Sequence, residues 1–276
     1  MGIGVARQAQ ANLARALLCV GLGLSTAALG QEPAAPGTTP PALSPTCEAP
    51  APDIATPTPL PHLAAALQGR KTVRVLAIGS SSTAGYGASS PSHSYPAQLE
   101  AILERAFKGL DVVIVNRGVS GEVAARTAER LKLQVALAQP DVVLWQVGTN
   151  DALARVPLED FTAAVRETLH WLKQYGIDVV LVGLQYTPAL SRDPYYTEIR
   201  AALRNLAATE SVLLVRRFEA MEFIDRAQEG QLLSGDDLHL NDLGYRCMAE
   251  HIARAVVVSA FMRPKLAPPA PSAGAQ

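Results

Sequence analysis

Residues 73–87 read Val-Arg-Val-Leu-Ala-Ile-Gly-Ser-Ser-Ser-Thr-Ala-Gly-Tyr-Gly and join an apolar run to a loop rich in serine and glycine. A short, continuous and β-branched apolar run is typical of a strand that is buried on both faces. The loop that follows places three serines between two glycines. The stretch therefore predicts a buried strand that ends in a polar loop, which could be a linker, a phosphate-binding turn or the site of a nucleophile.

Four further apolar runs of the same kind follow, at residues 111–116, 141–148, 177–184 and 211–215. They alternate with amphipathic stretches at residues 95–108, 122–138, 158–176, 195–208 and about 241–257. Strict alternation of strand and helix predicts a mainly parallel five-stranded sheet with right-handed crossovers. The expected fold is a three-layer α/β/α sandwich, and its functional groups should lie in the loops at the carboxyl ends of the strands.

The segments outside this alternation predict an exported protein with one domain. Residues 1–30 combine two arginines, a 14-residue apolar run over 16–29 and small residues before a cut at Gln31, as in a secretory signal peptide. That run is shorter than the about 20 residues that span a bilayer. We therefore expect a periplasmic or secreted protein that keeps no stable membrane anchor after signal cleavage.

Proline-rich sequence flanks the predicted domain on both sides. Residues 31–61 contain ten prolines, a density that predicts an extended tether. One domain is expected over residues 62–262, and the Pro/Ala-rich tail over residues 263–276 is expected to be disordered. No oligomeric state is predicted.

The charge of the chain excludes nucleic acid as a partner, and its cysteines allow a disulfide. The 276-residue chain has a net charge of −1, with acidic and basic residues interleaved, which excludes a basic surface for nucleic acid. Signal cleavage leaves two cysteines, Cys47 and Cys247. In an oxidising compartment such a pair is either a disulfide or two separate thiols, and the sequence leaves both open.

The loop after residue 79 does not match a phosphate-binding turn, because it lacks the lysine of a P-loop and the three-glycine spacing of a dinucleotide site. Nucleophilic catalysis needs a hydroxyl, a base, a group that orients the base and donors for the oxyanion. Among five histidines, His239 is favoured as the base, because Asp236 three residues earlier could accept its Nδ1 proton. Asp237 is a competing acid, His93 is an alternative base, and the two aspartates could instead cap a turn.

Two other loops could supply donors for an oxyanion. Asn150 follows the third strand within Gly-Thr-Asn-Asp, where it could be a turn former or could offer its side-chain amide. Gly118 follows the second strand and could offer a backbone N–H that no Cβ shields.

Together the four loops resemble the SGNH, or GDSL-type, esterase and lipase superfamily, whose name lists a Ser, a Gly, an Asn and a His from four sequence blocks. The resemblance covers about residues 70–260 and rests on the blocks at residues 79–85, 116–121, 148–151 and 236–241. It implies that Ser81 is the nucleophile, His239 the base and Asp236 the orienting acid. It also implies that the oxyanion is held by the N–H groups of Ser81 and Gly118 and by the Asn150 side chain, with no metal or organic cofactor.

The chain departs from the family pattern at Ser80, where the family usually has aspartate. Since the resemblance draws the triad acid from the last block, this change is not expected to abolish the mechanism. It is expected to change the hydrogen bonds that brace the nucleophile loop.

The substrate is less well determined by the sequence. We expect a short acyl chain, because the domain has no long apolar insertion that could act as a lid. Tyr86, and Tyr186 and Tyr195 in the loop over 185–196, are candidate substrate contacts, because tyrosines with polar neighbours suit a sugar surface. The hypothesis is an O-acetyl esterase of a glycan. Alternatives are a glycan O-acyltransferase with the same triad, a lysophospholipase or thioesterase, and a non-catalytic glycan-binding module.

Overall fold

The computed structural model describes residues 39–228 and 231–262. The predicted signal peptide and the predicted C-terminal tail lie outside the described residues. Within these ranges, no helix is both long enough and apolar enough to cross a bilayer.

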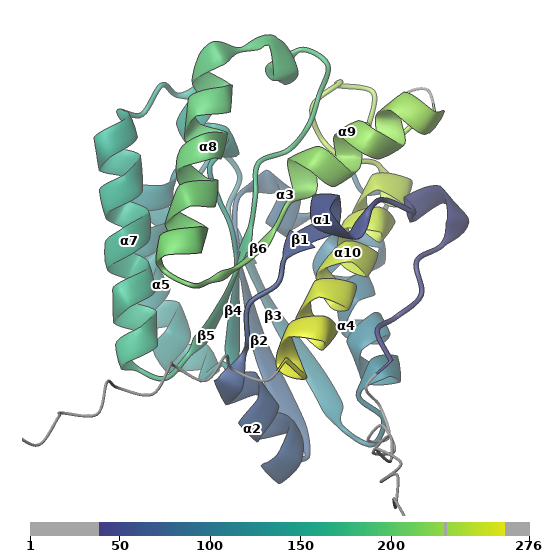
Figure 1. Cartoon of the computed structure of the whole chain (residues 1–276), viewed down its shortest axis with the longest axis vertical. Coiled ribbons are helices and arrows are strands. Elements are labelled where there is room, and N and C mark those ends of the chain that lie inside the picture. The colour runs from purple at the N-terminus through teal and green to yellow at the C-terminus, as the bar shows by residue number, and fades with distance from the viewer. Residues whose placement is uncertain (1–38, 229–230, 263–276) are drawn as a thin grey trace, which may run out of the picture. The chain divides into compact units, whose positions relative to one another are not determined.

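In the described part of the chain, six strands, one more than the predicted five, form one sheet in the order β1-β6-β5-β4-β2-β3 (Figure 1). Their bounds are Ala55–Thr56 (β1), Thr72–Gly79 (β2), Asp111–Gly118 (β3), Val142–Gln146 (β4), Asp178–Val182 (β5) and Leu213–Val215 (β6). The pairs among β2 to β6 are all parallel, which confirms the five predicted strands. Every residue of β4 and β5 is buried, as their unbroken apolar sequences require.

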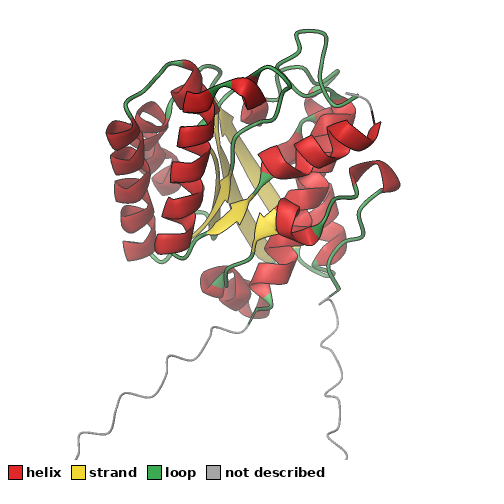
Figure 2. Cartoon of the chain, turned by 45° about the horizontal axis from the view of Figure 1, so that its top comes forward, coloured by secondary structure: helices red, strands yellow, loops and turns green. Residues whose placement is uncertain are grey.

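Two layers of helices enclose the sheet (Figure 2). Helices α5, α7 and α8 pack together on one face, and α4 and α10 pack together on the other. Their bounds are Tyr95–Ala106 (α4), Ala124–Ala138 (α5), Leu158–Gln174 (α7), Pro194–Thr209 (α8) and Asp242–Ala260 (α10). The predicted three-layer α/β/α fold is therefore confirmed. Short 3₁₀ helices lie at Pro45–Cys47, Pro91–His93 and Leu190–Arg192.

The prediction of an extended tether over residues 31–61 is wrong for its second half. The segment after Ser44 forms a 3₁₀ helix and α1 (Ala51–Ile54), and then β1, which pairs antiparallel with β6 at the edge of the sheet. Prolines prevent long regular elements but are tolerated in a first helical turn, and both short helices have one there. A high density of prolines therefore does not exclude packed structure.

A disulfide and hydrogen bonds attach this segment to α10. Cys47 is bonded to Cys247, 200 residues later in the chain, so the structure favours the disulfide over two free thiols. The Nε2 of the buried His251 lies 2.7 Å from the Cys47 carbonyl oxygen. The Ser44 N–H donates to the Glu250 carboxylate at 2.7 Å. We call residues 39–56 the strap, because they cross α10 and end as an edge strand.

Two of the longer helices in the described residues, α2 and α9, have no counterpart in the predicted pattern. Helix α2 (Pro61–Gly69) directly precedes β2, and α9 (Arg217–Gln228) directly follows β6. Helix α9 carries an arginine that is almost completely buried, Arg217.

The order of the strands places the candidate residues at one edge. Strand β2 lies between β3 and β4, and the chain moves to opposite sides of β2 when it forms these two neighbours. Ligands of open parallel sheets bind at such a switch point, at the carboxyl ends of the strands. The loops after β2, β3 and β4 all begin there.

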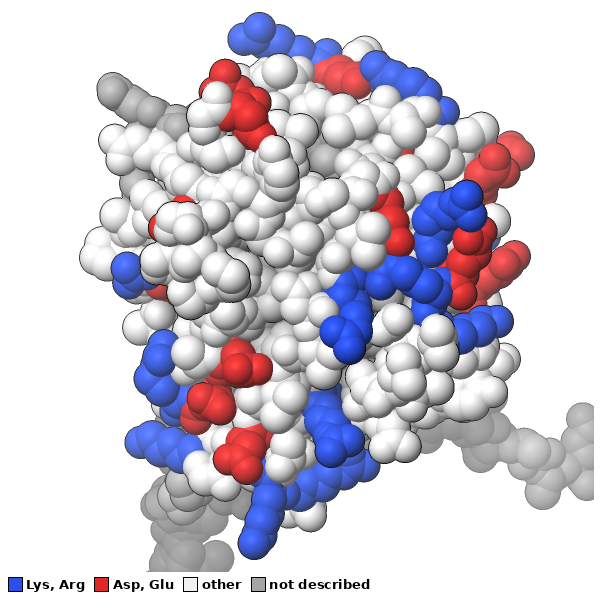
Figure 3. Space-filling view, turned by 180° about the vertical axis from the view of Figure 1, so that it is seen from behind, with Lys and Arg blue, Asp and Glu red and all other residues white. Residues whose placement is uncertain are grey.

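Acidic and basic side chains are mixed on the surface. Figure 3 shows Lys and Arg side chains standing beside Asp and Glu on one face of the described residues. Some ion pairs join two residues of the same helix, such as Arg126 with Glu129 in α5 and Arg226 with Glu222 in α9.

Candidate active site

The three serines after β2 lie in different environments. Ser80 and Ser82 are each only 4% exposed. Ser81 is the first residue of the short helix α3 (Ser81–Ala84) and is half-buried. Its Oγ lies 2.9 Å from Nε2 of His239, so Ser81 is the serine of the three that reaches a candidate base.

His239 is held in the loop between α9 and α10. Leu233 and Leu240 form an isolated β-bridge across this loop. The side-chain amide of Asn241 donates to the carbonyl oxygens of Gln231 and Leu233 at 2.7 and 3.0 Å. The same Asn241 caps α10 by accepting a hydrogen bond from the Gly244 N–H. The loop is therefore tied to the start of the last helix.

Asp236 orients the His239 imidazole. One carboxylate oxygen lies 2.6 Å from Nδ1, which fixes the ring so that Nε2 faces Ser81. The other oxygen accepts hydrogen bonds from the N–H groups of Leu238 and His239 and from the Ser234 hydroxyl. The imidazole and these donors hold the pKa of Asp236 well below its usual range, so the carboxylate stays ionised.

The alternative acid and base lie elsewhere. Asp237 adopts a left-handed backbone conformation with φ of 56°, and its neighbour's carboxylate is the one that contacts the imidazole. The Nδ1 of His93 lies 2.8 Å from the Ser89 hydroxyl, at an exposed position. The structure therefore favours Asp236 over Asp237 and His239 over His93.

Asn150 lies in α6 (Thr149–Leu153), which directly follows β4. Its amide nitrogen donates one hydrogen bond to the Glu122 carbonyl at 2.8 Å, which leaves the second N–H of the amide for a ligand. The neighbouring Asp151 accepts a hydrogen bond from the Ala124 N–H at 2.9 Å. These two contacts join the turn after β4 to the loop after β3.

The prediction that Gly118 donates to an oxyanion is contradicted by the structure. Its N–H donates to the side-chain oxygen of Asn116 at 2.9 Å and is not available to a substrate. Gly118 is instead needed for close packing, since a Cβ there would lie 2.1 Å from the Ala84 nitrogen. Asn116 also donates to the Thr83 carbonyl, so this strand end supports α3.

Gly121 is a donor that the sequence reasoning missed. The Glu122 N–H donates to the Val119 carbonyl, and Gly121 has φ of 80°, as the third position of a type II turn requires. In the described part of the chain, the N–H groups of Gly121 and Ser81 have no hydrogen-bond acceptor. The Ser-Gly pair at 120–121 is a turn signal that could have directed attention to this residue.

Ser80, which replaces the usual aspartate, is bonded to Gln146 at the end of β4. Both its N–H and its hydroxyl donate to the Gln146 side-chain oxygen, at 2.9 and 2.8 Å. A neutral amide from the neighbouring strand thus braces the start of α3. Gln146 was not singled out from the sequence.

The three tyrosines singled out as substrate contacts differ in exposure. Tyr86 is 58% exposed, and its ring centroid lies 4.4 Å from that of His239. Tyr186 is buried and packs edge-on against Phe218, and the Tyr195 hydroxyl donates to the Val156 carbonyl. The expectation of an open tyrosine surface on the loop over 185–196 is therefore wrong, because the scaffold covers these rings.

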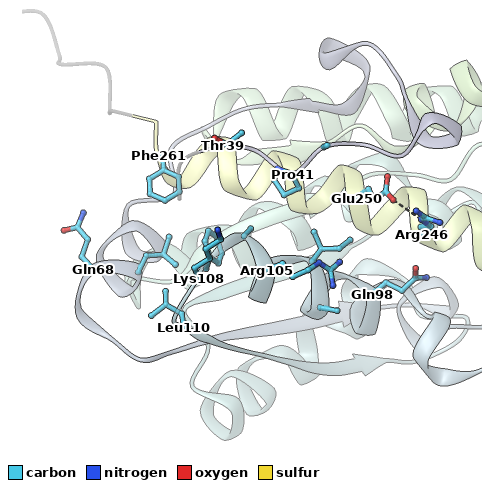
Figure 4. Close-up of a pocket in the computed structure, with 16 residues that line it drawn as sticks. Thr39, Pro41, Gln68, Gln98, Arg105, Lys108, Leu110, Arg246, Glu250 and Phe261 are labelled. Carbon is cyan, nitrogen blue, oxygen red and sulfur yellow. Dashed lines mark hydrogen bonds and ion pairs between the residues drawn. The ribbon is translucent and has the colours of Figure 1, made fainter. Parts of the chain in front are cut away.

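A groove of about 1290 Å³ lies beside α4 and α10 (Figure 4). Ile102, Arg105 and Lys108 line it, together with Leu110 just before β3 and Phe261 after α10. None of its lining residues belongs to the loops after β2, β3 or β4. Among the described residues, no group of three or more His, Cys, Asp or Glu side chains could hold a metal ion.

The chain is similar to known esterases and lipases. Residues 46–261 match the model of the non-GDSL lipase-like family. An arylesterase of Vibrio mimicus is 28% identical over 199 residues, which are 71% of this chain and 92% of the relative. The esterase TesA of Pseudomonas aeruginosa is 28% identical over 145 residues, which are 52% of this chain and 70% of the relative.

The fold is also found in a solved structure, the lipase/acylhydrolase from Enterococcus faecalis. That chain is 22% identical and has a TM-score of 0.59. The alignment covers 71% of this chain and 100% of the other. At this identity the likeness establishes the fold alone.

Proposed function

This chain belongs to the non-GDSL lipase-like family of SGNH-type esterases, and on that premise we propose that it hydrolyses short-chain acyl esters through an acyl-enzyme on Ser81. Its relatives include an arylesterase and the esterase TesA, and this chain is an ester-hydrolysing serine hydrolase. The observation that carries the proposal is the continuous relay from Ser81 Oγ through His239 to Asp236.

The first half of the reaction forms the acyl-enzyme. His239 Nε2 takes the hydroxyl proton while Ser81 Oγ bonds to the carbonyl carbon of the ester, and the electron pair moves to the carbonyl oxygen. When the tetrahedral intermediate collapses, the protonated imidazole donates its proton to the leaving alcohol. Water then attacks the acyl group, His239 takes a proton from that water, and Ser81 regains its own proton as the acid leaves.

Donors for the tetrahedral oxygen would come from three loops. We assign the role to the N–H of Ser81, the free amide hydrogen of Asn150 and the N–H of Gly121, in place of Gly118. The contact between Asn150 and the Glu122 carbonyl holds the Gly121 turn beside α6. Loss of one donor of this type typically lowers kcat about 10²- to 10³-fold.

The proposed substrate has a short acyl chain and a sugar as its alcohol. The groove that is large enough for a long chain lies away from Ser81, and strands β2 and β4 lead directly into α3 and α6. The exposed Tyr86 ring beside His239 offers an aromatic face of the kind on which sugar rings pack.

We also propose that the protein acts in the periplasm or outside the cell, as the signal-peptide pattern over residues 1–30 implies. The disulfide between Cys47 and Cys247 supports an oxidising compartment. N-terminal sequencing of the protein from a periplasmic or culture fraction should begin at Gln31. An intact N-terminus on a cytoplasmic protein would contradict this.

Substrate screening tests the proposed function. We expect hydrolysis of p-nitrophenyl esters to be fastest with acetate and to decline toward palmitate, and acetate to be released from acetylated xylan or peptidoglycan. Ser81→Ala should abolish all of these activities. A preference for palmitate would contradict the short-chain proposal, and net acetylation of a glycan by an acetyl donor would favour the acyltransferase alternative.

A further inference from the structure

Arg217 is an unusual residue in the core of this fold. It begins α9, is only 2% exposed and is among the largest fully buried side chains. In the described residues, its guanidinium contacts two hydroxyls and the sulfur of Met248 and no carboxylate, and its Nε has no hydrogen-bond partner. Buried charges are normally paired, because transfer of an unpaired charge from water to a protein interior is costly.

The guanidinium contacts both turns that carry the candidate active site. Its Nη1 donates to the hydroxyl of Ser82 at 3.1 Å, directly after the nucleophile Ser81. Its Nη2 lies 3.5 Å from the hydroxyl of Thr149, directly before Asn150. One side chain from α9 therefore contacts both α3 and α6 on their buried sides.

Gln185 completes this buried network. Its side-chain oxygen accepts from the Ser82 hydroxyl at 3.3 Å, and its backbone N–H donates to Thr149 at 3.1 Å. These contacts form a closed hydrogen-bonded ring beneath the surface of the site, which joins Arg217, Ser82, Gln185 and Thr149. All of its members are neutral except the guanidinium.

Three buried phenols surround the cation and do not neutralise it. Burial raises the pKa of Tyr95 and of Tyr196 to about 12, and burial likewise raises the pKa of Tyr245. The rings are therefore neutral near pH 7. Burial lowers the pKa of Arg217, but a guanidinium starts so high that it remains charged.

We propose that Arg217 is a positioning residue for the ester-hydrolysing site, which locks the Ser81 and Asn150 turns together and keeps an uncompensated positive charge behind the oxyanion donors. The inference rests on the proposed function. A buried charge acts over a longer range than one in water, since a low dielectric screens it weakly. Negative charge develops on the ester carbonyl oxygen only when the carbonyl becomes tetrahedral, so the cation favours the transition state over the bound ester.

Replacement of the charge tests this inference. Arg217→Met removes the cation and keeps an apolar side chain of related length, and Arg217→Lys keeps a positive charge. Arg200→Met is the matched control, because Arg200 lies 3.8 Å from the Phe218 ring in the same region and does not contact Ser82 or Thr149. Each variant is assayed for thermal unfolding, for kcat and KM, and for binding of phenylboronic acid, which adds to a serine hydroxyl as a tetrahedral anion.

We expect Arg217→Met to fold with a Tm equal to or above that of the unmodified protein, because a buried unpaired charge is removed. Its kcat should fall about tenfold or more while KM changes less than about twofold, and its boronate affinity should fall by a factor similar to that of kcat/KM. Arg217→Lys should recover part of both losses, and Arg200→Met should behave as the unmodified protein.

Two results would overturn the inference. One is a folded Arg217→Met with unchanged kcat and boronate affinity. The other is an equal loss of kcat in the Met and Lys variants with unchanged boronate affinity.

If Arg217→Met does not fold, Arg217→Lys decides, since the proposal requires it to keep boronate affinity within about threefold. If the unmodified chain hydrolyses no ester, the proposed function fails, whereas boronate binding read by calorimetry still decides the role of Arg217.

Discussion

Ser80, Ser81 and Ser82 have the same side chain and three different functions in the structure. Ser80 braces α3 through Gln146, Ser81 faces His239, and Ser82 receives the buried guanidinium of Arg217. The differences arise because the chain turns sharply from β2 into α3, so that consecutive side chains point in different directions. Reactivity at this loop is therefore a property of the position and not of the residue type.

Replacement of Asp236 tests the relay at the scale of one residue. We expect Asp236→Asn to lower kcat for p-nitrophenyl acetate on the order of 10²- to 10⁴-fold, because an amide no longer favours the tautomer with Nδ1–H. The matched control is Asp237→Asn, since asparagine tolerates the left-handed conformation at that position. Equal loss of activity in the two variants would mean that the acid has been wrongly assigned.

Some residue roles could be predicted from the sequence and others could not. The spacing of Asp236 and His239 was informative because i and i+3 side chains meet in a tight turn. Gly118 ends β3 and Gly121 lies three residues later, and only the three-dimensional structure shows that the Asn116 side chain accepts from the Gly118 N–H. Arg217 gave no signal, because arginine is normally exposed and its sequence neighbours do not reveal its burial.

At the scale of the elements, the site depends on how closely β3 approaches α3. Strands β2 to β6 could be predicted because buried parallel strands are continuous apolar runs. Strand β1 could not, because it has two residues and follows a proline-rich segment without periodicity. Its position is determined by tertiary pairing with β6.

Substitution of Gly118 tests this close approach. A methyl group at Gly118 would overlap the backbone of Thr83 and Ala84, so we expect Gly118→Ala to lose about 1–3 kcal/mol of unfolding free energy and to displace α3. Urea unfolding and kcat should both report the change. Gly69→Ala is the control, because nothing lies within 4 Å of a Cβ at that helical position. A fully stable and active Gly118→Ala would contradict the packing described above.

At the scale of the whole molecule, the strap ties the first described residues to the last helix. It contacts α10 through Cys47, through Ser44 and through the carbonyl that faces His251, and it completes the sheet as β1. None of these contacts involves Ser81 or His239. Stability and catalysis should therefore be separable in this protein.

Removal of the disulfide should affect stability and spare activity. Because the bond closes a loop of about 200 residues, we expect the double variant Cys47→Ser/Cys247→Ser to lose about 2–5 kcal/mol of unfolding free energy. Its kcat on p-nitrophenyl acetate at 25 °C should stay near that of the unmodified protein. Reductant should destabilise the unmodified protein and leave the double variant unchanged, and an unmodified protein that is insensitive to reductant would argue against the bond.

His251 should make stability depend on pH. Burial lowers its pKa in the folded state below the usual 6.5, an effect opposed by the Cys47 carbonyl and by Glu250 and reinforced by Arg254. As pH falls below about 6.5, the unfolded chain binds this proton before the folded chain does, so stability decreases with acidification. Thermal unfolding between pH 7.5 and 5 should show a shallower decrease in His251→Gln than in the exposed control His93→Gln. Equal slopes would remove His251 as the cause.

Labelling of the purified protein with a fluorophosphonate probe tests the central claim most directly. The account predicts that the unmodified protein is labelled, that Ser81→Ala is folded and unlabelled, and that Ser80→Ala and Ser82→Ala keep the label because neither serine faces His239. A folded, unmodified protein that is not labelled, or labelling that persists in Ser81→Ala, would contradict it.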